Sequence, residues 1–205
     1  MRVAVAAYVA AASLVASCTF LSPRHDPSRF YTLSARPAVG APNGPGPSVV
    51  VGPVSLPAYL DRNEVAVRVS PSELKYAVAE RWAEPLVQNF TRVLIEDLGN
   101  ALGSERVASV TTAPVVNPDF FVEVVVVRFE AGADGLVHLT ARWAVRDGAR
   151  KIVRIRQTQH ERQATGATTE ERVNAQSAAV GDLAEEISST IREIVAEKPA
   201  PAERR

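Results

Sequence analysis

The sequence has few of the residues that build disulfides or metal centres. Cys18 is the only cysteine, so a disulfide within one chain is excluded. The three histidines have no cysteine partner and no spacing typical of metal ligands; they are His25, His138 and His160. We therefore expect no structural disulfide, no metal and no cofactor.

The sequence also lacks an excess of charge of either sign. Its 23 basic residues balance 23 acidic residues, so the formal net charge at pH 7 is zero. Proteins that bind nucleic acid carry a basic field, and no nucleic-acid partner is expected here. A hydrophobic content of 46% is sufficient for a core, and the length fits one domain with appendages.

Catalytic motifs are missing as well. The sequence contains no Gly-x-Ser-x-Gly motif and no His–Glu metal pair. His160 and Glu161 are adjacent, so they point to opposite faces of a strand. Glu80 and Glu84 would lie together only on a helix, which Pro85 disfavours at that place. The sequence therefore predicts that the protein is not an enzyme.

The N-terminus carries a clear export signal. Arg2 precedes fifteen uncharged residues, Val3 to Ser17, which end in small side chains. A short positive region, an apolar region and small residues are typical of a secretory signal peptide. The run is too short for a spanning helix, which needs about 20 apolar residues, and no later run is long enough.

The end of this signal, Val15-Ala16-Ser17-Cys18, resembles the lipobox of bacterial lipoproteins. The resemblance implies a diacylglyceryl group on the Cys18 thiol, cleavage between Ser17 and Cys18, and acylation of the new amino group. A plain secretory signal with an incidental cysteine is the alternative. In the enterobacterial pattern, Asp after the cysteine retains a lipoprotein in the inner membrane. Thr19 therefore implies anchoring in the outer membrane, with the body in the periplasm of a Gram-negative bacterium.

We expect four parts along the chain. Residues 1–17 are the lipoprotein signal peptide, and residues 18–28 are a polar tether. Residues 29–197 form a single α+β periplasmic domain, because apolar periodicity continues through them. Residues 198–205 are rich in Pro, Ala and charge and form a flexible tail.

The strand signals predict one mostly antiparallel sheet of about five to seven strands. The candidate segments are 29–33, 48–57, 64–69, 74–78, 107–110, 120–129, 136–145 and 151–159. Pro53 and Pro57 favour an edge position or a bulge for the second segment. Asp134-Gly135 and Asp147-Gly148 predict tight turns with each glycine at positive φ, and hence an antiparallel meander.

Residues 136–145 show the clearest alternation. The residues predicted to face the core are Val137, Leu139, Ala141, Trp143 and Val145, and those predicted to face outward are His138, Thr140, Arg142 and Arg146. Arg154 and Arg156 are expected beside these outward arginines, on a solvated face that also carries Glu123 and Glu130.

Two amphipathic helices complete the prediction. The first opens at Glu84-Pro85 and stops at Gly103, where glycine is a common C-terminal cap. The second begins at Thr168, whose spacing to Glu171 matches a capping box, and runs to about Glu197. Each has one apolar stripe, so both must pack on the sheet. The predicted fold class is α+β with two layers.

Several segments of the chain resemble segments of one protein family, and they occur in the same order. After the lipobox come Phe30-Tyr31-Thr32-Leu33, the segment Val54–Arg62 and Trp82-Ala83-Glu84-Pro85-Leu86. With them the chain resembles the ABC-type transport auxiliary lipoproteins, the PqiC group, over the whole mature length. The resemblance implies an outer-membrane lipoprotein that assists an intermembrane lipid transport system. It also implies docking to an MCE-domain protein on the periplasmic side and assembly as a homo-oligomeric ring.

Alternatives to this role stay open at the level of sequence. A lipoprotein that assembles or chaperones another outer-membrane complex would share the anchor and the small α+β body. For partner binding we single out Tyr59, Asp61, Arg62 and Trp82, because aromatic and arginine residues are enriched in interface hot spots. Trp82 is equally well explained as a packing residue of the body.

Overall fold

The computed structural model describes residues 26–38, 46–111 and 117–197. The signal peptide, Ser17, Cys18 and the tail therefore lie outside the described residues, and so does all but the last part of the tether.

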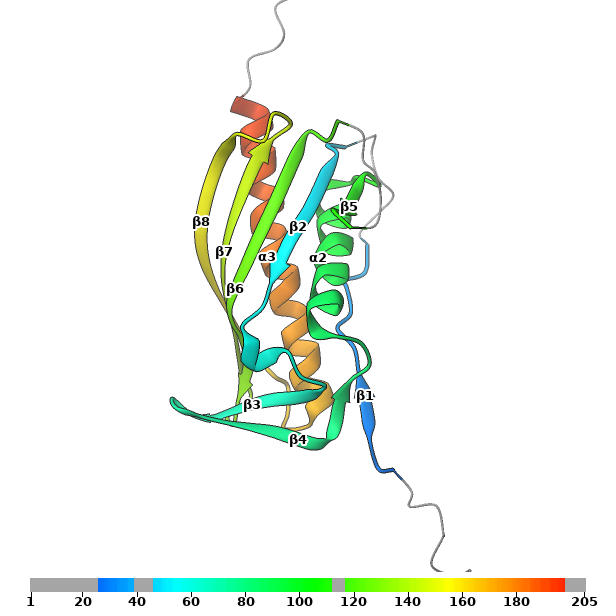
Figure 1. Cartoon of the computed structure of the whole chain (residues 1–205), viewed down its shortest axis with the longest axis vertical. Coiled ribbons are helices and arrows are strands. Elements are labelled where there is room, and N and C mark those ends of the chain that lie inside the picture. Colours follow the sequence, from blue (N-terminus) through cyan, green and yellow to red (C-terminus); the bar gives the residue numbers. More distant parts are fainter. Residues whose placement is uncertain (1–25, 39–45, 112–116, 198–205) are drawn as a thin grey trace, which may run out of the picture.

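One eight-stranded sheet and two long helices make up the domain. The elements are β1 (Arg29–Tyr31), β2 (Val49–Ser55), the short 3₁₀ helix η2 (Ala58–Leu60), β3 (Glu64–Ser70), β4 (Glu73–Trp82), α2 (Leu86–Leu102), β5 (Val107–Ser109), β6 (Phe120–Gly132), β7 (Leu136–Asp147), β8 (Ile152–Gln163) and α3 (Thr169–Glu197). Both helices lie side by side on one face of the sheet (Figure 1). The predicted α+β, two-layer fold is confirmed, with one strand more than the upper end of the predicted range.

The sheet branches at its longest strand, β6. Strand β7 pairs with one edge of β6, and β8 pairs with β7, both antiparallel. The other edge of β6 pairs in parallel with β2 along its first half and with β3 at its end. The sheet is thus more mixed than predicted: β2 is parallel to both β5 and β6, and the long connection from β2 to β5 includes α2, as a crossover between parallel strands requires.

Strand β2 lies inside the sheet, between β5 and β6. Its register with β6 shifts between Val51 and Val54, where Gly52 and Pro53 are joined by a cis peptide bond. The missing N–H of Pro53 therefore falls in the irregular stretch, where it interrupts no ladder bond. Of the two sequence-based alternatives for β2, the bulge is confirmed and the edge position is wrong.

The two turns of the meander differ. Gly135 has φ of +80°, as predicted for Asp134-Gly135. Gly148, however, is not at positive φ; Arg150 takes the left-handed position with φ of +64°. The Arg150 N–H donates to Asp147 O at 2.8 Å, and the Asp147 N–H donates to Lys151 O at 3.0 Å. The turn is longer than predicted, and its left-handed residue comes two positions later.

The helix ends largely follow the sequence signals. Thr168 N–H donates to Glu171 Oε2 at 2.9 Å, and Glu171 N–H donates to Thr168 Oγ1 at 3.2 Å, which is the predicted capping box. Gly103 ends α2 in the left-handed region with φ of +59°. Pro85 sits immediately before the first helical residue rather than within the first turn.

The core fills the space between the helices and the sheet. All five predicted inward residues of β7 are at most 2% exposed. Phe90 of α2 meets Phe129 of β6 edge to face, with ring centroids 5.2 Å apart. Neither helix of the described residues is long and apolar enough to cross a membrane.

The arginines of β8 do not lie where they were predicted. Arg154 and Arg156 face α3 and pair with Glu197 at 3.2 Å and Glu193 at 4.0 Å. His160 and Arg162 continue this row, with Glu186 and Asp182 as partners. The row exists because β8 overhangs the edge of the apolar core, so its inward side chains meet the polar flank of α3.

Candidate functional site

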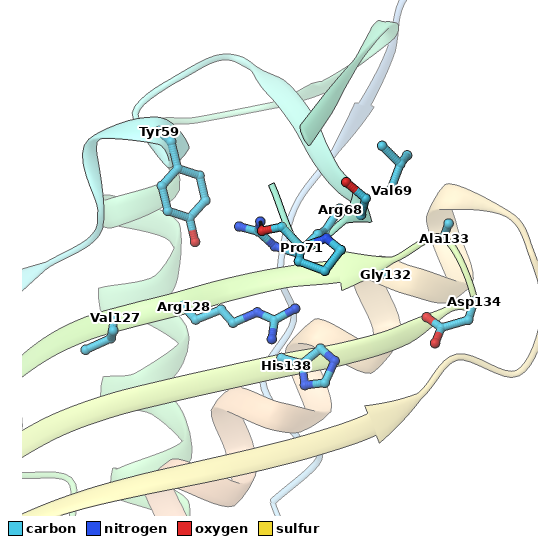
Figure 2. Close-up of a pocket in the computed structure, with 11 residues that line it drawn as sticks. Tyr59, Arg68, Val69, Pro71, Val127, Arg128, Gly132, Ala133, Asp134 and His138 are labelled. Carbon is cyan, nitrogen blue, oxygen red and sulfur yellow. Dashed lines mark hydrogen bonds between the residues drawn. The ribbon is translucent and has the colours of Figure 1, made fainter. Parts of the chain in front are cut away.

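A groove of about 740 Å³ opens between the η2–β3 segment and the β6–β7 pair, on the face of the sheet away from the helices. It is lined by Tyr59, Arg68, Val69, Ser70, Pro71, Val127, Arg128, Gly132, Ala133, Asp134 and His138. Figure 2 shows Tyr59, Arg68, Arg128 and His138 gathered around its centre.

Strand β6 positions a carboxylate at the base of this groove. Phe129 and Ala131 are buried in the core between the helices and the sheet, so Glu130 between them points to the opposite face. The register with β7 shifts between Val126 and Arg128. This irregularity changes which side chains alternate to each face, and it places Arg128 next to Glu130 on the groove side.

Glu130 is fully buried, with 0% exposure. Its Oε2 accepts the Tyr59 hydroxyl at 2.6 Å and the Phe129 N–H at 3.3 Å. Its Oε1 accepts Nε–H of Arg68 at 2.5 Å and of Arg128 at 2.8 Å. A buried charge is tolerated only when it is paired and hydrogen-bonded, and this carboxylate meets both conditions.

The electrostatics of this cluster follow from its contacts. Burial by itself raises the pKa of Glu130, but hydrogen bonds from Tyr59, Arg68 and Arg128 outweigh it and leave the pKa below its ordinary value. Burial, and then the hydrogen bond to Glu130, raise the pKa of Tyr59 to about 12. At neutral pH the cluster therefore holds an ionised Glu130 and a neutral tyrosine.

The sequence did not single out this cluster. Glu130 was expected on a solvated sheet face, and that prediction is wrong because Tyr59, Arg68 and Arg128 cover it. The position of Glu130 near the end of the mostly apolar run 120–131 is a signal that was available, since an unpaired carboxylate is rarely buried. Its partners come from a distant turn and strand, which no local pattern indicates.

The predicted partner-binding residues separate into two groups. Asp61 and Arg62 are exposed, and the Arg62 guanidinium lies 4.5 Å from the centre of the Tyr76 ring. Tyr59 is half-buried and points toward Glu130. Trp82 is only 5% exposed and packs in the core. This burial favours the packing interpretation of Trp82, and partner binding by Trp82 stays a prediction.

The other segments that carried the family resemblance meet at the start of α2. Tyr31 pairs with Trp82 in the β1–β4 ladder, and the Ala83 N–H donates to Tyr31 O at 2.8 Å. Arg92 Nη2 donates to Glu84 Oε1 at 2.9 Å and to Thr32 Oγ1 at 3.0 Å. These residues thus join β1 to the helix and form structural contacts rather than an open site.

A second groove, of about 880 Å³, lies between α2 and strands β2 and β5. It is more apolar, and its lining includes Val54, Val87, Ile95, Val107 and Val110. Within the described ranges, no group of three or more His, Cys, Asp or Glu side chains is arranged to hold a metal ion.

Comparisons with solved structures find proteins with a similar fold. Crystal structures of two proteins share it: an uncharacterised protein, 21% identical with a TM-score of 0.67 over 80% of this chain and 98% of that chain, and XCC0632 from Xanthomonas campestris. The latter is 17% identical, with a TM-score of 0.65 over 82% of this chain and 99% of that chain. At these identities the likeness shows the fold alone.

A weaker likeness is to the PelC dodecamer from Paraburkholderia phytofirmans. It is 11% identical, with a TM-score of 0.40 over 76% of this chain and 93% of that chain, which is too low to inform assembly. No curated protein matches the chain.

The sequence model of one family matches residues 31–188. This family is described as the ABC-type transport auxiliary lipoprotein component. The match runs from the last residue of β1 through most of α3, so it includes the Glu130 cluster and the exposed turn at Asp61 and Arg62. The chain therefore belongs to the family of ABC-type transport auxiliary lipoprotein components.

Proposed function

We propose that the protein is anchored in the outer membrane and assists an MCE/ABC-type system that carries lipids between the two membranes. In this role it docks to the MCE protein on the periplasmic side, assembled as a homo-oligomeric ring. The observation that carries the proposal is the family match over residues 31–188. The lipobox at Val15-Ala16-Ser17-Cys18 and the following Thr19 support the location.

The anchor and the domain are close in sequence. Residues 18–28 separate the lipidated cysteine from β1, and a fully extended chain of that length spans at most about 40 Å. Three acyl chains would hold the protein on the bilayer essentially permanently, since each buried methylene contributes about 0.8 kcal/mol. The domain then works close to the periplasmic surface of that membrane.

The exposed turn at Asp61 and Arg62 is the proposed contact with the MCE protein. Tyr59 fixes this turn to the sheet through Glu130, and the Tyr76 hydroxyl donates to Tyr59 O at 3.1 Å. The turn is therefore rigid before binding, which lowers the entropy cost of an interface. Tyr59 supports the turn, whereas Asp61 and Arg62 offer charge to the partner.

Cross-linking and affinity purification of the full-length protein from membranes test the proposal. We expect an MCE protein among the captured partners, and a barrel protein in its place would contradict the role. The double change Asp61→Ala and Arg62→Ala should weaken capture about thirtyfold if the turn is a hot spot. Arg142→Ala, on the outer face of β7, is the matched control. A folded double variant that captures the MCE protein at full strength would move the contact elsewhere.

A further inference from the structure

The groove beside Glu130 presents more hydrogen-bond donors than the protein uses. Arg68 directs Nε to Glu130 and Nη1 to Pro71 O at 3.1 Å. Arg128 uses only Nε, which donates to Glu130. In the part of the chain that the structure describes, the terminal nitrogens of Arg128 have no protein acceptor, and its side chain is 35% exposed. This guanidinium is therefore available to a ligand oxygen.

The centre of the groove also keeps a positive charge. The single negative charge of Glu130 lies against two guanidinium groups, those of Arg68 and Arg128. The carboxylate among the residues that line the groove, Asp134, lies in the β6–β7 turn, where its Oδ1 accepts the Leu136 N–H. Figure 2 shows Asp134 at the far end of the groove from Arg128. His138 lies opposite Glu130 in the β6–β7 pairing and pairs with Glu161 at 3.1 Å.

Apolar residues also line the groove. They are Val69, Pro71, Val127 and Ala133, and Val127 is 44% exposed. The groove volume falls within the range of about 300–1,000 Å³ that is usual for small-molecule sites. A ligand that combines an oxyanion with an apolar substituent would match both parts of the lining.

We propose that this groove binds a phosphate group, held by Arg128 and Arg68, with an apolar substituent against Val127. A phosphate offers several oxygens, so it accepts hydrogen bonds from two guanidinium groups on different strands at once. Two sources share this chemistry, a phospholipid head group and a free phosphate. The groove residues of β3 belong to the end of the molecule at which the chain enters β1 (Figure 1). The anchored chain thus brings the groove near a bilayer, which favours the head group. The proposal is independent of the MCE partner.

Titration calorimetry on the full-length protein, extracted from membranes in a non-ionic detergent, tests the ligand class. The probes are sodium phosphate, glycerophosphoglycerol, dihexanoyl phosphatidylglycerol and, without phosphate, dihexanoylglycerol. We expect the phosphatidylglycerol to bind most tightly and the head group alone to bind more weakly. Binding of sodium phosphate alone would identify free phosphate as the source. Equal binding of dihexanoylglycerol, or no binding of any probe, would overturn the proposal.

Three variants test the site. Arg128→Gln should weaken phosphate binding about tenfold or more, because it removes a charge-assisted donor pair. Arg142→Gln controls for loss of a distant positive charge. If Arg128→Gln does not fold, Arg128→Lys keeps the charge without the planar fork and should show intermediate affinity. Wild-type affinity in a folded Arg128 variant would show that the site is elsewhere.

Discussion

Asn89 Oδ1 accepts the backbone N–H of Leu33 at 3.1 Å, although the two residues are 56 positions apart. The next backbone groups are held in the same way. Ser34 N–H donates to Ser177 Oγ at 3.1 Å, and Arg36 N–H donates to Asp97 Oδ1 at 2.7 Å. The segment after β1 therefore crosses both helices with its N–H groups satisfied by their side chains. These hydrogen bonds hold the N-terminal part of the domain, which leads to Cys18, against both helices.

The first prediction concerns this attachment. Asn89→Ala should lower the free energy of unfolding by about 1–3 kcal/mol, because the N–H of Leu33 is left unpaired in the core. Leu33 is 1% exposed, so water cannot replace the lost acceptor. Urea denaturation monitored by circular dichroism measures the change. Asn100→Ala is the control: its exposed side chain donates to Arg36 O at 3.1 Å, and its loss should cost no more than about 0.5 kcal/mol. Equal stability of the two variants would contradict the role of Asn89.

A second prediction concerns Asp97 on the same segment. Its Oδ2 is buried and has no hydrogen-bond partner among the described residues, and burial raises its pKa despite the N–H of Arg36. A raised pKa in the folded state means that the protonated form is favoured. This contribution to stability is complete below the ordinary pKa near 4 and is lost as pH rises through the raised value. Asp97→Asn should therefore raise the melting temperature at pH 7.

The pH dependence of the melting temperature separates the effect of the Asp97 charge from a gain in stability that is the same at every pH. The difference in melting temperature between Asp97→Asn and the wild type should shrink as pH falls through the raised pKa of Asp97, where the wild-type carboxylate takes up a proton. Asparagine keeps an oxygen for the Arg36 N–H, so the contact at 2.7 Å is not lost. A difference that stays constant with pH would show that the Asp97 charge is not its cause.

A structural feature could be predicted from the sequence when the residues that determine it are close together in the chain. The inward face of β7 and the capping box at Thr168 were correct because each depends on residues within one strand or one turn. Gly103 and Gly135 were correct for the same reason. Gly148 was not, because Asp-Gly also fits a longer turn whose left-handed residue is Arg150.

Long-range features were missed. The burial of Glu130 depends on the irregularity between Val126 and Arg128 and on partners from η2 and β3. A change of one position moves a side chain to the other face of a sheet, and no local pattern locates such a change. Arg154 and Arg156 were assigned to the wrong face because β8 alternates weakly and its partner, α3, follows it in sequence.

A third prediction tests the Glu130 cluster. Glu130→Gln should lower the free energy of unfolding by roughly 3 kcal/mol, since removing one partner of a buried ion pair costs about 3–5 kcal/mol. The lower end is expected because Arg68 and Arg128, 21% and 35% exposed, can turn toward water. Tyr59→Phe should cost about 1.5 kcal/mol, the contribution of one hydrogen bond to a charged group.

The pH dependence of this cluster has the opposite sign to that of Asp97. The pKa of Glu130 is lowered in the folded state, so its contribution is present above the ordinary pKa near 4.3 and is lost as pH falls through the lowered value. The gap between the wild type and Glu130→Gln should be widest at neutral pH and should close in acid. Urea titrations at several pH values measure it. A gap that widens in acid would contradict an ionised, paired carboxylate.

The last prediction concerns the N-terminal anchor, on which the proposed location depends. We expect Cys18 to be the first residue of the mature protein and to carry lipid on its thiol and its amino group, because Val15-Ala16-Ser17-Cys18 matches the lipobox pattern. Mass spectrometry of the protein extracted from membranes should find an acylated N-terminal cysteine. Cys18→Ala should accumulate as uncleaved precursor, since the peptidase acts only after the thiol is modified. Ser17→Thr, which retains the thiol, is the control and should still be lipidated. Detection of Met1 or of a free Cys18 thiol in the mature wild-type protein would contradict the anchor, and the plain secretory signal would then be correct.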